Sequence, residues 1–102
     1  MLRIDPSKIG EVTLSLFVEH QMYSQTFSSA PQGILGHIVR FLNQYQIRPD
    51  QLRGIEVSMN GGTFTGVRTA TTIANMFHLA FGTRLSGEDR YLSASYTGEP
   101  RL

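Results

Sequence analysis

The sequence contains no cysteine, and this absence excludes disulfide bridges, thiolate nucleophiles and zinc sites built from cysteine. It also has no excess of one charge, because nine Lys and Arg residues face eight Asp and Glu residues, for a net charge of +1. The basic residues are spread along the chain, with no run that could follow a phosphate backbone. We therefore predict no direct nucleic-acid binding.

Long apolar runs are also missing. No stretch approaches the roughly 20 apolar residues that cross a bilayer. Arg3, Asp5 and Lys8 follow Met1 closely, which leaves no room for the apolar segment of a signal peptide. We expect a cytoplasmic protein without membrane contact. Its 102 residues, 40% of them apolar and 17% charged, are expected to form a single domain over residues 1–102.

The first third of the chain is expected to form β-strands. Residues 11–18 alternate apolar and polar side chains, and residues 21–28 are expected to return as the second strand of a hairpin. Residues 2–5 either begin the first of these strands or form a separate strand before Pro6. The turn at Glu19 and His20 carries no Asn-Gly signal, so the register of the hairpin stays open.

Helical patterns follow. A helix is predicted from Pro31 to about residue 46, ending before Pro49, and a second over about residues 65–81 with Gly82 just past its end. A strand over residues 54–59 separates them, and weaker strand patterns occur at 84–85 and 91–96. The order β-β-β-α-β-α-β predicts an α/β fold with a mixed sheet and helices packed on it.

Both helices carry more apolar surface than a sheet needs. Their apolar arcs span roughly 160° and 180°, whereas a helix on a sheet requires a stripe only somewhat wider than about 100°. The surplus either joins the two helices to each other or forms a contact with another protein chain. The candidate interface residues, taken from the edges of the two arcs, are Leu35, Val39, Leu42, Ile73, Met76 and Ala80.

The sequence offers no catalytic constellation. The three histidines fall in separate elements without HxxxH or HExxH spacing, and the serines lie outside any G-x-S-x-G setting. We therefore predict no catalytic residues, no metal site and no cofactor.

A glycine-rich segment between the central strand and the second helix has two interpretations. Gly61, Gly62 and Gly66 could cradle a phosphate at the helix N-terminus, with Asp5 near a metal ion, or could form the packing corner of the fold. The segment lacks both a Walker lysine and G-x-G-x-x-G spacing, which favours the corner. Arg68 opposes the helix dipole in the first turn, so we expect a specific acceptor to hold it.

The same segment resembles the signature of the TsaB family, in which a strand leads into a Gly-Pro-Gly-Ser-Phe-Thr-Gly-Leu-Arg turn and then a helix. Identical positions are Gly62, Phe64, Thr65, Gly66 and Arg68, and the substituted ones are Asn60, Gly61, Thr63 and Val67. Residues 2–7 are similar to the opening strand of the family and its Leu-Asp-Thr-Ser turn. The resemblance covers about residues 1 to 87.

This resemblance implies one N-terminal lobe of ribonuclease-H-like type, as in the actin/Hsp70 superfamily. TsaB proteins are glycoprotease-like, non-catalytic partners of TsaD-type enzymes in tRNA threonylcarbamoyladenosine synthesis. They associate with that enzyme, and with themselves, through the helices of this lobe. For this chain the resemblance implies a helix-mediated homodimer or a heterodimer with a TsaD-like protein.

The chain departs from the family in two ways. It spans one lobe where the family has two, and residues 86–89 (Ser-Gly-Glu-Asp) fall where an apolar fifth strand is expected. A reduced relative whose role has narrowed to association is the first hypothesis. The alternatives are a nucleotide- or phosphate-binding module that uses residues 60–66, and a free half-domain with another role.

Overall fold

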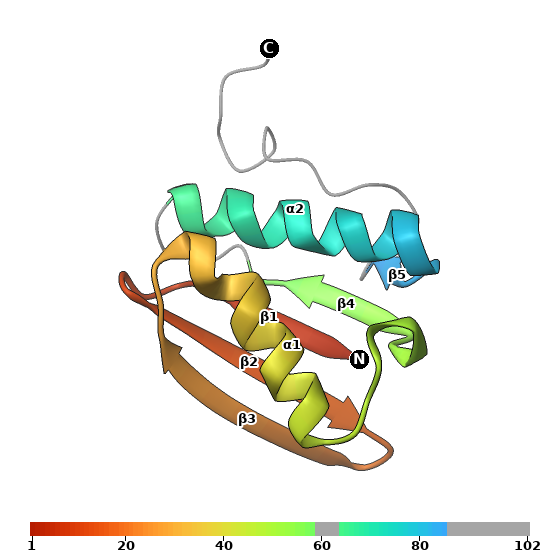
Figure 1. Cartoon of the computed structure of the whole chain (residues 1–102). Coiled ribbons are helices and arrows are strands. Elements are labelled where there is room, and N and C mark those ends of the chain that lie inside the picture. The colour runs from red at the N-terminus through yellow and green to blue at the C-terminus, as the bar shows by residue number, and fades with distance from the viewer. Residues whose placement is uncertain (59–63, 86–102) are drawn as a thin grey trace.

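The computed structural model describes residues 1–58 and 64–85, and these form a mixed five-stranded sheet with two α-helices on one of its faces (Figure 1). The strand order is β3-β2-β1-β4-β5. The strands are β1 (Leu2–Asp5), β2 (Glu11–Val18), β3 (Gln21–Ser28), β4 (Gly54–Val57) and β5 (Arg84–Leu85). The predicted α/β class and element order are confirmed.

The antiparallel half of the sheet is built from β1, β2 and β3. Residues 2–5 form a separate strand that pairs with β2, and the Asp5 carboxylate accepts the Ser7 N–H (3.0 Å) as the chain leaves it. The hairpin has a two-residue turn in which Glu19 has a φ of 55°. This closes the register that the sequence left open, with Val18 opposite Gln21.

The first helix differs from its prediction at both ends. A 3₁₀ turn (Pro31–Gly33) precedes α1 (Ile34–Gln44). The helix stops two residues early because Gln46 adopts a φ of 59°, while Ile47 N–H donates to Leu42 O and Gln46 N–H to Asn43 O. This is a Schellman motif with glutamine at the position glycine usually occupies, which the sequence pattern did not signal.

The parallel half consists of β1, β4 and β5. A second 3₁₀ turn (Pro49–Gln51) leads into β4, which ends at Val57 rather than at residue 59. The second helix, α2 (Phe64–Phe81), ends as predicted at Gly82, whose φ is +73°. The predicted strand over 91–96 lies outside the described residues. In the described part of the chain, no helix is long and apolar enough to cross a membrane.

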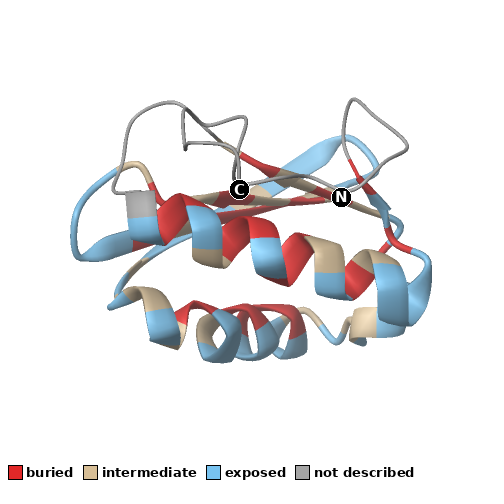
Figure 2. Ribbon diagram, turned by 90° about the horizontal axis from the view of Figure 1, so that it is seen from above, coloured by how far each residue is buried: buried red, intermediate tan, exposed pale blue. Residues whose placement is uncertain are grey.

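The core lies between the helices and the sheet (Figure 2). Its largest fully buried side chain is Phe41 of α1, which contacts the rings of Phe27 and Tyr45. Along α2, Ala70 and Ala74 are completely buried, and their small side chains let the helix approach the sheet closely. Strands β1, β2 and β4 turn their buried apolar residues toward the helices, whereas β3 contributes only the partly buried Tyr23 and Phe27.

The opposite face of the sheet is polar. The hydroxyl groups of Thr13 and Thr26 are 2.8 Å apart, and the guanidinium group of Arg3 lies 3.5 Å from the Glu56 carboxylate. The same Arg3 lies over the Phe17 ring. The Met1 ammonium group donates to the Phe17 carbonyl oxygen (2.9 Å), and partial burial lowers the pKa of this amine.

Candidate functional site: an exposed apolar face on the two helices

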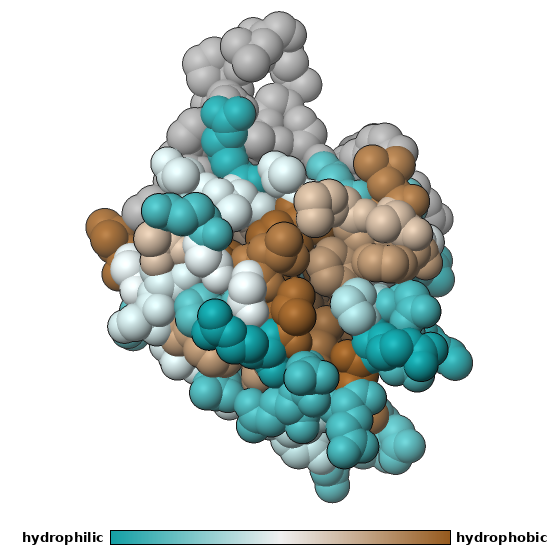
Figure 3. Space-filling model, viewed as in Figure 1, coloured by the Kyte–Doolittle hydropathy of each residue, from teal (hydrophilic) through white to brown (hydrophobic). Residues whose placement is uncertain are grey.

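Apolar side chains remain exposed on the outer side of the helical layer. Leu35 and Val39 of α1 are 37% and 48% exposed, Met76 of α2 is 46% exposed, and Ala80 is also exposed. We call these four residues the helix face. Figure 3 shows apolar surface gathered over the middle of the helical layer and over the C-terminal half of α2. Leu79, about 60° around α2 from Met76, extends it at the end of the helix, whereas the exposed Phe81 lies on another side of α2 and contacts the Phe77 ring.

The helix face lies along the seam between α1 and α2. Leu35 and Val39 are one turn apart, as are Met76 and Ala80, so each pair forms a short ridge. On α1, His37 stacks on Phe27 of β3, with ring centroids 4.7 Å apart. That contact occupies the β3 side of α1 and leaves Leu35 and Val39 on the side nearer α2.

The orientation of α2 follows from its last turns. The Nδ1 atom of His78 lies 2.9 Å from the carbonyl oxygen of Thr83, so the His78 side of α2 is directed toward the β5 end. Met76 lies about 200° around the helix from His78. The ridge of Met76 and Ala80 therefore lies on the side of α2 that is nearer α1.

Two of the six predicted interface residues belong to the core. Leu42 is 1% exposed and Ile73 is 5% exposed, and both join the main apolar cluster. Each lies on the side of its own helix that faces the sheet and the other helix. Part of the surplus apolar surface is therefore buried inside the domain, and of the six predicted residues the four of the helix face remain for an external contact.

The glycine-rich turn is only partly described. Asn60, Gly61, Gly62 and Thr63 lie outside the described residues, and the backbone of Phe64 begins α2. Gly66 is buried, whereas Thr65 and Arg68 are exposed on the first turn of the helix. The acceptor that we expect for Arg68 stays a prediction.

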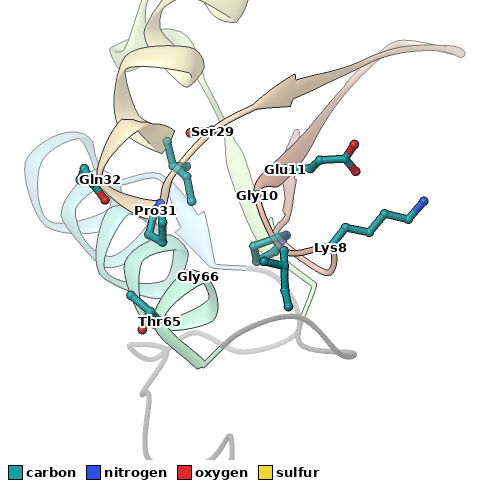
Figure 4. A pocket seen from close by; sticks show the side chains of 11 residues that line it. Lys8, Gly10, Glu11, Ser29, Pro31, Gln32, Thr65 and Gly66 are labelled. Carbon is teal, nitrogen blue, oxygen red and sulfur yellow. The ribbon is translucent and has the colours of Figure 1, made fainter.

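A pocket of about 370 Å³ lies beside the start of α2 (Figure 4). The turn after β1 contributes Lys8 to its lining, the segment before α1 contributes Ser29, and α2 contributes Thr65 and Gly66. In Figure 4 the amino group of Lys8 points away from the lining residues contributed by the segment before α1 and by the start of α2. The pocket thus has helix N-terminal residues beside it, and among the described residues that line it Lys8 does not direct its charge into it.

The chemistry-bearing side chains do not converge in the described part of the chain. No group of three His, Cys, Asp or Glu residues that could hold a metal ion occurs within residues 1–58 and 64–85. The histidines lie apart: His20 in the β2–β3 turn, His37 against Phe27, and His78 at the end of α2. The Asp5 carboxylate is engaged by the Ser7 N–H.

Comparison with known proteins identifies the fold. No family model and no curated protein matches the sequence. The solved structures that resemble the chain include YeaZ from Pseudomonas aeruginosa and an uncharacterized protein described as similar to peptidase YEAZ from Pseudomonas aeruginosa. Each has a TM-score of 0.71 and 21% sequence identity, and each alignment covers 82% of this chain.

The alignments cover only 40% of each solved chain, so this sequence spans less than half the length of the proteins it resembles. At 21% identity the likeness establishes the fold. The resemblance to TsaB proteins, first inferred from the glycine-rich turn, is confirmed at that level. The chain has the mixed α/β fold of YeaZ, a TsaB protein, over a part consistent with the N-terminal lobe.

Proposed function

We propose that this chain is a non-catalytic, cytoplasmic TsaB-like protein that acts by association in tRNA threonylcarbamoyladenosine modification. Its partner is a TsaD-like enzyme or a second copy of the chain. The observation that supports this most is the helix face, since Leu35, Val39 and Met76 leave large apolar side chains uncovered in a small domain. Contiguous apolar surface of this kind is typical of protein–protein contacts.

The strand order supports a finer assignment of the lobe. Three antiparallel strands followed by two parallel ones, in the order β3-β2-β1-β4-β5, fit a ribonuclease-H-like lobe of the actin/Hsp70 type. We assign the chain no catalytic step, because its three histidines lie on separate elements and its Asp5 carboxylate caps a turn.

The helix face can be tested by placing a charge on it. Val39→Asp and Met76→Asp are each expected to weaken association at least tenfold, because docking would bury a carboxylate without a partner. Light scattering should show a lower molar mass than the wild type, for the chain alone or for its mixture with a TsaD-like protein. Gln44→Asp, an exposed position about 140° around α1 from Val39, is the matched control.

Circular dichroism should show all three variants folded, because the substituted side chains are exposed. If Val39→Asp and Met76→Asp associate as strongly as Gln44→Asp, the helix face is not the contact. A wild-type chain that is monomeric and binds no TsaD-like protein would contradict the proposed function as a whole.

The pocket beside α2 supports the alternative, a nucleotide- or phosphate-binding module. Calorimetry with ATP and magnesium tests it. Under our first proposal we expect no saturable heat at millimolar nucleotide, because the Lys8 amino group is not directed into the pocket. Saturable binding that Lys8→Gln weakens would favour the alternative. Lys8 is exposed, so the variant should fold normally.

A further inference from the structure

Strand β3 forms an open edge of the sheet that lacks the usual protection against pairing. Natural edge strands are kept short, or carry charges, prolines or bulges. Residues 21–28 contain neither a charged residue nor a proline, and their register with β2 is continuous over the whole strand. Most of their side chains are exposed, and within the described residues β3 pairs only with β2. Such an edge can accept another strand.

The backbone groups that face this edge follow from the pairing on the inner side. Phe17 exchanges both of its backbone hydrogen bonds with Met1, at 2.9 and 2.8 Å. Its N–H and C=O are therefore directed away from Met22, which lies opposite it on β3, and Phe17 and Met22 are a non-hydrogen-bonded pair. The N–H and C=O of Met22 then face the open edge. The alternation along a strand places those of Ser24, Thr26 and Ser28 there as well.

We propose that two copies of this chain join antiparallel through these edges, about a two-fold axis at Gln25. Hydrogen-bonded pairs must then join residues whose backbone groups face outward. An axis at Gln25 pairs Met22 with Ser28 of the second copy and Ser24 with Thr26, so all four outward-facing residues are used. An axis at Ser24 would leave Ser28 without a partner.

The side chains agree with this register. Tyr23 comes opposite Phe27 of the second copy in a non-hydrogen-bonded pair, where cross-strand side chains are closest. Ser24 comes opposite Thr26, which repeats the hydroxyl pairing seen between Thr13 and Thr26 inside the sheet. Because residues 21–28 carry no charge, no like charges meet across the axis. The edge is therefore self-complementary in hydrogen bonding and in aromatic contact, and no charge repulsion within residues 21–28 opposes the pairing.

The absence of cysteine makes a direct test simple, because a single introduced cysteine is the only thiol that can form a disulfide. Gln25→Cys would place two thiols across the axis at a Cα separation of about 4.5 Å, within the range of a disulfide. Gln21→Cys is the matched control on the same strand. Its two positions would lie about eight residues apart, or roughly 26 Å. Under mild oxidation we expect at least tenfold more disulfide-linked dimer from Gln25→Cys.

Thr26→Pro provides a second measurement. It removes an outward N–H while keeping the β2–β3 ladder, as edge strands tolerate, so light scattering should show loss of the edge dimer with unchanged circular dichroism. Equal, slow cross-linking of Gln25→Cys and Gln21→Cys would overturn edge pairing. Faster cross-linking of Ser24→Cys would overturn the register.

The edge proposal and the helix-face proposal can be tested independently of each other. Disulfide formation by Gln25→Cys should persist when Val39→Asp is added, because Val39 lies on α1 and takes no part in the edge. Self-association that survives Thr26→Pro and is lost in Val39→Asp would assign it to the helix face and overturn the edge proposal. If neither Val39→Asp nor Met76→Asp weakens self-association, the self-association is assigned to the β3 edge and not to the helix face.

Discussion

Leu42→Asp is expected to unfold the domain, whereas Val39→Asp, three residues earlier on the same helix, should leave it folded. Leu42 is 1% exposed and lies in the core, while Val39 is 48% exposed. The change removes a buried leucine and leaves a carboxylate without a partner, at a cost of roughly 5 kcal/mol or more. Small domains have only about 5–15 kcal/mol of stability in total. Chemical denaturation followed by circular dichroism measures the difference.

The second helix supplies an independent pair of variants, one buried and one exposed. Ile73→Asp should behave as Leu42→Asp does, because Ile73 is 5% exposed, and Met76→Asp should behave as Val39→Asp does. A folded Leu42→Asp protein with native-like stability would show that the flank of α1 is open to solvent. The assignment of the four exposed residues as the complete helix face would then be wrong.

Phe41→Ala should cost about 3–5 kcal/mol of unfolding free energy. Phe41 is the largest fully buried side chain, and its ring packs edge-on against Phe27 (6.3 Å between centroids) and Tyr45 (5.3 Å). Truncation would leave a cavity between α1 and β3, beside the Phe27 and Tyr45 rings. A lowered urea midpoint with an unchanged m-value would report the loss.

Phe81→Ala is the control for aromatic truncation. Phe81 also contacts another ring, that of Phe77 (5.7 Å between centroids), but it is 46% exposed at the end of α2. Its loss should cost no more than about 1 kcal/mol. A comparable destabilisation by both variants would mean that the end of α2 is as tightly packed as the centre of α1.

The two proposed contacts occupy different parts of the molecule. The helix face lies on the layer formed by α1 and α2, and the open edge lies on β3, at the opposite end of the strand order from β5. A chain with both can pair with its own copy through one surface while the other binds a different protein. Two self-complementary surfaces on one chain would instead build a larger closed or open assembly.

Much of the fold was predictable because local patterns carried it. Period-two alternation located β2, the expected hairpin located β3, and Gly82 marked the end of α2 correctly. The end of α1 was predicted less well, because Gln46 takes the left-handed conformation that glycine usually provides. No residue type there signals the stop, and the hydrogen bonds of Gln46 and Ile47 to the preceding turn decide it.

The sequence by itself determined the fold class, the positions of the helices, and the fact that each helix has more apolar surface than a sheet can cover. It could not decide which apolar residues stay outside, because Leu42 and Val39 are only about 60° apart around α1. The tertiary structure decided this: the packing of α1 against the sheet and α2 turned Leu42 inward and left Val39 exposed. It also left β3 at the edge, since strand order depends on contacts between distant segments rather than on local pattern.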